Sequence, residues 1–142
     1  MSTSPLFASN PRQQGFALAL VRIITGIVFI AHGYQKLFVM GISGTQGGFT
    51  KMGVPMPTIT APLVTFLEFF GGIGLVIGLL TRLIALGLTF DMLGAIATVH
   101  LANGFFLPKG YEFVLTLMVA SLALVVGGPG RLSVDNLIAS KQ

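Results

Sequence analysis

The chain has 142 residues, of which 54% are hydrophobic and only 8% are charged, whereas about 25% of the residues in soluble domains are charged. This composition is typical of a single integral membrane domain, and the eight lysines and arginines are too dispersed to form a nucleic-acid-binding surface. Because the sequence contains no cysteine, it excludes disulfides, thiol redox chemistry and cysteine-ligated metal clusters within these residues.

Four apolar segments are long enough, or nearly so, to cross a bilayer as helices. They cover residues 16–38, 58–80, 83–101 and 111–127. The first lacks a signal-peptide cleavage site, so we expect it to stay in the mature protein. A tight turn at Thr81 and Arg82 joins the second segment to the third, and residues 131–142 form a short interfacial tail. We predict that residues 1–142 form one all-α domain, an integral membrane four-helix antiparallel bundle.

Basic residues predict the orientation of this bundle. Cytoplasmic connections between membrane spans carry an excess of lysine and arginine. One side carries Arg12, Arg82, Arg131 and Lys141, and the other carries Lys51 and Lys109. We therefore predict that both termini lie in the cytoplasm.

Residues 22–38 form the most informative stretch, because an arginine, a histidine and a lysine lie within an apolar segment. At 100° per residue, Lys36 projects about 40° from Arg22 and His32 about 80° from it, so the three side chains share one side of a helix. Ionisable residues within a membrane span usually face protein or a cavity and mark functional sites. We expect this side of the helix to face the bundle interior.

One carboxylic acid lies near the centre of each of the next two segments, Glu68 in the second and Asp91 in the third. An unpaired ion at the bilayer centre costs about 2.5–3.5 kcal/mol, so these acids need a partner or a proton. We predict that Arg22 pairs with Asp91, with Glu68, or with both. Two interpretations stay open: the ions clamp the bundle, or His32, Glu68 and Asp91 are catalytic residues that exchange protons.

A second polar group is predicted towards the side of the membrane opposite the termini. Its members are His32, Lys36, His100 and Glu112. Lys36 within it also fits an end-of-helix lysine whose ammonium group extends to the membrane surface. The spacing of the two histidines does not indicate haem or metal ligands, so we predict no metal site. The candidate ligand-binding residues are Arg22, His32, Lys36, His100 and Glu112.

Glycines recur at helical spacing within the apolar segments and include the G-x-x-x-G pattern, which lets helix backbones approach closely. We predict that they pack helix against helix. The glycines concerned are Gly26, Gly33, Gly71, Gly74, Gly78, Gly87 and Gly94.

Several motifs follow one another along the chain. They are R-x-x-x-G-x-x-F-x-x-H-G-x-x-K-L-F at residues 22–38, G-V-P-x-P at 53–57, E-F-F-G-G-I-G-L-V-I-G-L-L-T-R at 68–82, H-x-x-N-G-F-F at 100–106, Y-E at 111–112 and G-P-G-R-L-S-V-D at 128–135. In this order and spacing, nearly the whole chain resembles the DoxX family of small bacterial membrane proteins. The resemblance implies a four-helix inner-membrane protein related to the small subunit of thiosulfate:quinone oxidoreductase. Some members of the family are linked to membrane-associated oxidoreductase complexes.

Three functions stay open. In the first, the chain is a quinone-linked oxidoreductase subunit, in which a non-covalently bound quinone lies near His32 and Lys36 with its tail between helices. Its electrons come from a partner or a diffusible donor. The second is a non-catalytic assembly subunit that docks through its glycine-lined faces. The third is a small-solute carrier, which is less well supported because the sequence contains no evident inverted repeat. The expected partners are the lipid bilayer and either further copies of the chain or other subunits of a membrane complex.

Overall fold

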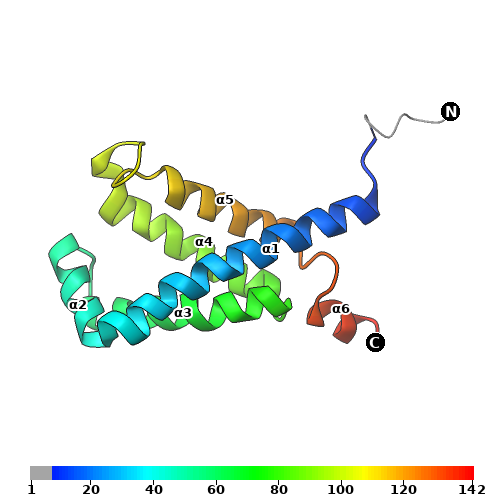
Figure 1. Ribbon diagram of the computed structural model, residues 1–142, viewed down its shortest axis with the longest axis horizontal. Helices are drawn as coiled ribbons and strands as arrows, with labels where there is room; N and C mark the ends of the chain where they lie inside the picture. The colour runs from blue at the N-terminus through cyan, green and yellow to red at the C-terminus, as the bar shows by residue number, and fades with distance from the viewer. Residues whose placement is uncertain (1–7) are drawn as a thin grey trace.

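The computed structural model describes residues 8–142, and within that range it contains helices and no strand. Two shorter helices, α2 (Gly41–Met52) and α6 (Val134–Ala139), lie at the two ends of the molecule (Figure 1). The all-α prediction is confirmed. The body consists of four helices, which are α1 (Pro11–Tyr34), α3 (Pro57–Ile77), α4 (Thr81–Ala95) and α5 (Glu112–Gly127).

Two of these helices continue beyond their α-helical part. The π-helical segment η1 (Gln35–Met40) extends α1, and the π-helical segment η2 (Ile96–His100) extends α4 into the short 3-10 turn η3 (Leu101–Asn103). Gly41 then has a φ of +71°, which turns the chain from η1 into α2. Three helical runs are therefore long and apolar enough to span a membrane, and α5 is a shorter apolar helix.

The boundaries of these helices follow local capping rules. α1 begins at Pro11 rather than at residue 16, because proline suits the first helical position and the Asn10 side chain accepts the Arg12 backbone N–H at 2.8 Å. α3 ends at Ile77, where Gly78 adopts the left-handed conformation with a φ of +73°. The turn to α4 therefore precedes Thr81, and the prediction that Thr81 and Arg82 form it was slightly misplaced.

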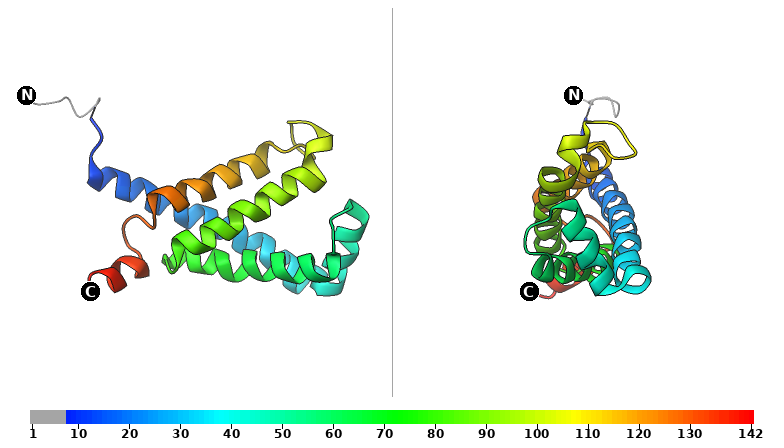
Figure 2. Two further views of the ribbon diagram at one scale, coloured as in Figure 1. Left: turned by 180° about the vertical axis from the view of Figure 1, so that it is seen from behind. Right: turned by 90° about the vertical axis from the view of Figure 1, so that its left-hand side faces the viewer.

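Successive spans run antiparallel (Figures 1 and 2). α1 packs along α3, α4 packs along α5, and contacts between α3 and α4 and between α1 and α5 join the two pairs. α1 begins and α6 ends at one end of the bundle, which we call the terminal end. The opposite end, with α2 and residues 101–111, is the loop end. The antiparallel four-helix membrane bundle is confirmed, and the side of the membrane that each end faces stays a prediction.

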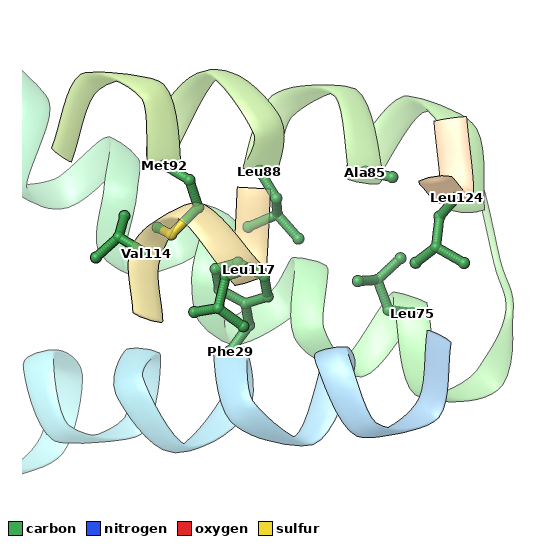
Figure 3. Packing of buried hydrophobic residues seen from close by; sticks show 8 residues of the cluster. All are labelled: Phe29, Leu75, Ala85, Leu88, Met92, Val114, Leu117 and Leu124. Atoms are coloured by element: carbon green, nitrogen blue, oxygen red, sulfur yellow. The ribbon is translucent and has the colours of Figure 1, made fainter. Parts of the chain in front are cut away.

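Apolar side chains fill the space between the helix pairs (Figure 3). The packed side chains extend from Leu75 and Leu124 towards the terminal end to Met92 and Val114 towards the loop end. Between them, Phe29 is 1% exposed and Leu88 is fully buried. An apolar core therefore occupies much of the length of the bundle.

Glycines bring α1 and α3 into backbone contact. A Cβ atom at Gly26 would lie 2.8 Å from the Gly72 carbonyl oxygen, and a Cβ atom at Gly33 would overlap the backbone of Phe69. Both distances are shorter than side chains tolerate, so these positions require glycine for the helices to pack as they do. Gly72 belongs to the same crossing and was not among the glycines predicted to pack.

The remaining predicted packing glycines differ in what surrounds them. Gly71 and Gly74 lie against the Ile84 side chain of α4, and Gly87 of α4 lies against a leucine of α3. Gly94 is exposed, and a Cβ atom there would meet no atom within 4 Å. The prediction for Gly94 is therefore wrong within the described chain, because α4 turns this residue away from the other helices.

Candidate functional site

A cluster of ionisable side chains lies inside the bundle where η1, α3 and α4 meet. The Lys36 ammonium group lies 2.5 Å from a Glu68 carboxylate oxygen, and Glu68 is 4% exposed. The Asp91 carboxyl group is close enough to Glu68 and Lys36 to interact electrostatically with both, and Asp91 Oδ2 is buried without a hydrogen-bond partner among the described residues. One cation and two acids therefore meet at Glu68. We call this group the Lys36–Glu68–Asp91 cluster.

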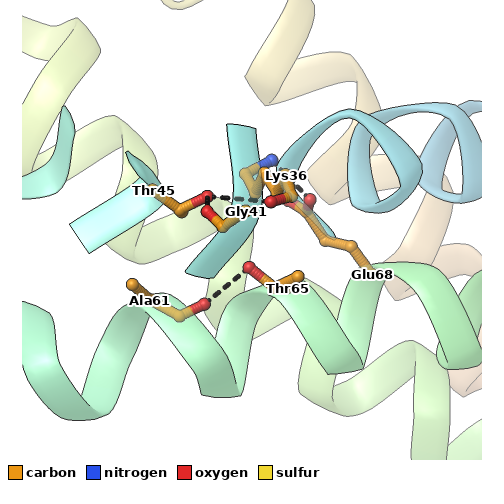
Figure 4. A network of polar contacts seen from close by, with 6 residues as sticks. All are labelled: Lys36, Gly41, Thr45, Ala61, Thr65 and Glu68. Carbon is orange, nitrogen blue, oxygen red and sulfur yellow. Dashed lines mark hydrogen bonds and ion pairs between the residues drawn. The ribbon is translucent and has the colours of Figure 1, made fainter. Parts of the chain in front are cut away.

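The segment around η1 holds Lys36 in place. The Thr45 hydroxyl group of α2 donates to the carbonyl oxygens of Lys36 at 3.1 Å and of Gly41 at 2.9 Å (Figure 4). Thr45 is 1% exposed, and Phe49 of the same helix is also buried. π-Helical turns frequently occur at functional sites. α2 therefore supports the irregular turn that carries the ammonium group, and this role of Thr45 was not predicted from the sequence.

His32 lies at the edge of the cluster and is exposed. It precedes Lys36 by one helical turn and is close enough to Lys36 and Glu68 to interact electrostatically with both. Its ring centroid is 6.2 Å from that of Phe113 on α5. The structure thus brings together the three predicted catalytic residues and adds Lys36 to them. His32 is the member of this group that faces outward from the bundle, so the prediction that its side of the helix faces the interior is wrong for this residue.

Arg22 lies elsewhere, and the prediction that it pairs with Glu68 or Asp91 is wrong. Arg22 is fully buried, and its Nη2 donates to the carbonyl oxygens of Arg131 at 3.3 Å and of Leu132 at 2.9 Å. A Cβ atom at Gly78 would overlap its guanidinium group. Because ten residues of α3 separate Gly78 from Glu68, the two ionic groups lie about 15 Å apart along the helix.

The chain after α5 encloses Arg22 and also caps α4. The Asp135 carboxylate accepts the backbone N–H groups of Leu80 at 2.8 Å and Thr81 at 2.9 Å, and the Asp135 N–H donates to the Gly78 carbonyl oxygen at 2.9 Å. A carboxylate at a helix N-terminus stabilises the unpaired N–H groups and the helix dipole. The motif at residues 128–135 is therefore structural. We use the name arginine latch for Arg22, Gly78 and Asp135 together with the Arg131 and Leu132 carbonyl groups that accept from Arg22.

His100 and Glu112 hold the loop at the other end of the bundle. His100 Nδ1 lies 2.9 Å from the Lys109 carbonyl oxygen, and the Glu112 carboxylate accepts the Leu107 N–H at 2.8 Å. Their polar partners lie within or beside residues 101–111, and neither bonds to the Lys36–Glu68–Asp91 cluster. The predicted ligand-binding residues thus fall into three groups: Arg22 in the latch, His32 and Lys36 at the cluster, and His100 and Glu112 in the loop.

Comparison with known proteins identifies the family. The sequence profile of the DoxX family matches residues 17–101, which include His32, Lys36, Glu68 and Asp91. This chain belongs to the DoxX family. The resemblance that the motifs indicated is therefore confirmed.

Relatives from several bacteria match the DoxX protein over most of its length. It is 33% identical to the "Putative oxidoreductase CatD" of Bacillus subtilis over 84% of each chain. It is 35% identical to the inner membrane protein YqjF of Escherichia coli over 86% of this chain and 92% of that protein. It is 31% identical to an uncharacterized membrane protein of Mycobacterium tuberculosis over 85% of this chain and 80% of that protein. No solved structure matches the chain.

These matches and the apolar helices establish a multi-pass protein of the bacterial inner membrane. An intramembrane cluster of a cation, two acids and a histidine is the part of such a protein where ligand or proton chemistry is expected. Of the ionisable side chains that we have located, only this cluster combines buried acids with an outward-facing histidine. It is therefore the candidate functional site.

Proposed function

We propose that this DoxX protein is a quinone-binding subunit of a membrane oxidoreductase. In this proposal the quinone ring lies beside His32 and Lys36, and the acids Glu68 and Asp91 exchange the accompanying protons. The observation that supports it is the Lys36–Glu68–Asp91 cluster, buried in the bundle with His32 at its outward edge. One relative carries the name of an oxidoreductase, which is consistent with this class of function.

His32 and Lys36 support binding of the ring. Their nitrogen atoms can donate hydrogen bonds to the two carbonyl oxygens of a quinone. The two residues lie one turn apart on the same side of the run formed by α1 and η1. The Lys36 side chain is 18% exposed and His32 is exposed, so a ligand can reach both without unpacking the core.

Glu68 and Asp91 support proton exchange. Reduction of a quinone to a quinol consumes two electrons and two protons, with one proton bound to each former carbonyl oxygen. Two adjacent carboxyl groups can share a proton and pass it on, while the Lys36 ammonium group compensates the remaining negative charge. We assign the electrons to a partner chain or a diffusible donor.

The apolar core favours proton exchange from the loop end. Phe29, Leu75 and Leu88 are at most 1% exposed and lie between the cluster and the arginine latch. Most of the side chains in this layer are apolar, and proton transfer across an apolar layer is unfavourable. The cluster is therefore expected to exchange protons with the water at the loop end, next to α2 and residues 101–111.

The proposal is tested by binding a short-chain quinone to the purified protein. We expect His32→Ala to weaken binding at least about tenfold, which corresponds to about 1.4 kcal/mol. His100→Ala is the matched control, because it removes the other histidine from the loop and is expected to change affinity less than about twofold. Absence of quinone from the gently purified protein, together with no measurable binding by the wild type, would refute the proposal.

One observation favours the second function, that of an assembly subunit. Gly94 is exposed on α4, and a Cβ atom there would meet nothing within 4 Å. This position leaves room for the close approach of a helix from another chain. If the assembly function holds, Gly94→Leu will release the chain from a purified complex, and Glu68→Gln will leave turnover unchanged.

A further inference from the structure

A groove runs between α1 and α5 on the lipid-facing surface of the bundle. It has a volume of about 450 Å3, and its exposed surface is apolar. The residues that line it include Leu20, Ile24 and Val28 from α1 and Phe113, Leu117 and Ala120 from α5. None of the groups that we assigned to the quinone ring lies within it.

The groove is narrow at one end and leads to the candidate site at the other. Towards the terminal end, α1 and α5 approach so closely that a Cβ atom at Gly127 would lie 2.7 Å from the Leu18 side chain. Towards the loop end, Val28 precedes His32 by one helical turn on the same face of α1. Phe113 lines the groove, and its ring is 6.2 Å from the His32 ring.

Helix packing explains why the groove exists. The face of α1 that carries Gly26 and Gly33 lies in backbone contact with α3. The side of α1 towards α5 carries Ile24 and Val28, which line the groove, and Ile24 is 60% exposed. α1 is thus close to α3 and separated from α5 over the same part of its length.

We propose that this groove binds the polyisoprenoid tail of the quinone. The inference rests on the proposed function, because the ring at His32 fixes where the tail begins. From there the tail extends past Phe113 and Val28 towards Leu20. An apolar chain attached to a polar ring fits a groove that is apolar along its length and ends at a histidine. The ligand enters sideways from the bilayer.

The test compares two quinones with the same ring, one with a long polyisoprenoid tail and one with no tail. Binding is measured in lipid nanodiscs, with each quinone expressed as a mole fraction of the lipid, so that partitioning into the bilayer does not distort the comparison. We expect the wild-type protein to bind the tailed quinone at least about tenfold more tightly. This preference measures the contribution of the groove.

Ala120→Phe fills the groove and is expected to abolish the preference for the tailed quinone while changing the affinity for the tail-less quinone less than about twofold. Ala123→Phe is the matched control, because Ala123 is an exposed residue of α5 outside the groove. It is expected to change neither affinity. Ala120→Leu, a smaller replacement, provides the same test if Ala120→Phe does not fold.

Two results would overturn the groove proposal while leaving the proposed function intact. In the first, the wild type binds both quinones equally well, or Ala120→Phe keeps the preference. In the second, native mass spectrometry finds a phospholipid that excess tailed quinone does not displace and that Ala120→Phe removes, so the groove holds an acyl chain instead. If the wild type binds neither quinone, the proposed function itself fails.

Discussion

The arginine latch and the Lys36–Glu68–Asp91 cluster are both ionic groups buried in one membrane bundle, yet their surroundings differ. Arg22 is fully buried, and backbone carbonyl oxygens of the same chain accept its hydrogen bonds. In the cluster, the partners are titratable side chains, Lys36 is 18% exposed on its side chain, and His32 faces outward.

This difference separates a structural ion from a candidate reactive one. Backbone carbonyls cannot take up or release a proton at ordinary pH, and Arg22 is fully buried. Two carboxyl groups beside an ammonium group can gain or lose a proton with little rearrangement. Burial of a charge in a membrane span is therefore informative about function only when its partners are known.

The largest expected effect is that of Gly78→Ala in the arginine latch. The new Cβ atom would overlap the Arg22 guanidinium group, and alanine disfavours the φ of +73° at this position. We expect a loss of about 3–4 kcal/mol in the free energy of unfolding, measured in mixed detergent micelles. Gly94→Ala, at an open position, is the control and is expected to change stability by less than about 1 kcal/mol.

Glu68→Gln should have the next largest effect on stability. It leaves the Lys36 ammonium group without its carboxylate partner, and because that side chain is partly exposed we expect a loss of about 2–3 kcal/mol. The double variant Lys36→Met/Glu68→Gln removes both charges and should recover at least half of that loss. Quinone binding should stay impaired in both variants. Restored quinone binding in the double variant would show that the cluster only holds the helices together, as the arginine latch does.

Asp135→Asn should have a smaller effect. The amide keeps one acceptor oxygen for the N–H groups of Leu80 and Thr81 but loses the charge that interacts with the N-terminus of α4. We expect a loss of about 0.5–1 kcal/mol in the free energy of unfolding, with quinone affinity unchanged. A change in quinone affinity without a change in stability would show that the latch is coupled to the ligand.

Glu112→Gln should have the smallest effect and is the matched comparison for Glu68→Gln. The glutamine side-chain oxygen can still accept the Leu107 N–H, so we expect less than about 0.5 kcal/mol of change in stability and unchanged quinone affinity. Loss of quinone binding in this variant would show that Glu112 belongs to the ligand site, as was predicted from the sequence.

Much of the fold was predictable because a membrane-spanning helix can be recognised from its own stretch of residues. Twenty or so apolar residues in a row identify a helix without knowledge of its neighbours. The exact helix ends were predicted less well, because the first segment was expected to begin at residue 16 rather than at Pro11 and the second to end at residue 80 rather than at Ile77. The motifs along the chain, in their order and spacing, were enough to indicate the family. Asp135 was missed as a capping residue because its partners, Leu80 and Thr81, lie more than fifty positions earlier in the chain.

The partner of each ion could not be read from the sequence. Arg22, His32 and Lys36 share one side of a helix, but helical periodicity places a residue around an axis and leaves its depth relative to other helices undetermined. That depth depends on the position of α1 along α3. The close backbone contacts at Gly26, Gly72 and Gly33 fix this position. Lys36 rather than Arg22 therefore lies opposite Glu68.

Composition and hydropathy alone determined that this protein is a helical membrane bundle with a few costly charges inside it, since each span must satisfy its own backbone in lipid. Tertiary structure alone decided which charges meet, which glycine touches a backbone and where a groove opens beside His32. Those outcomes depend on contacts between segments distant in the chain, and such contacts follow from the packing of whole helices rather than from any single stretch of residues.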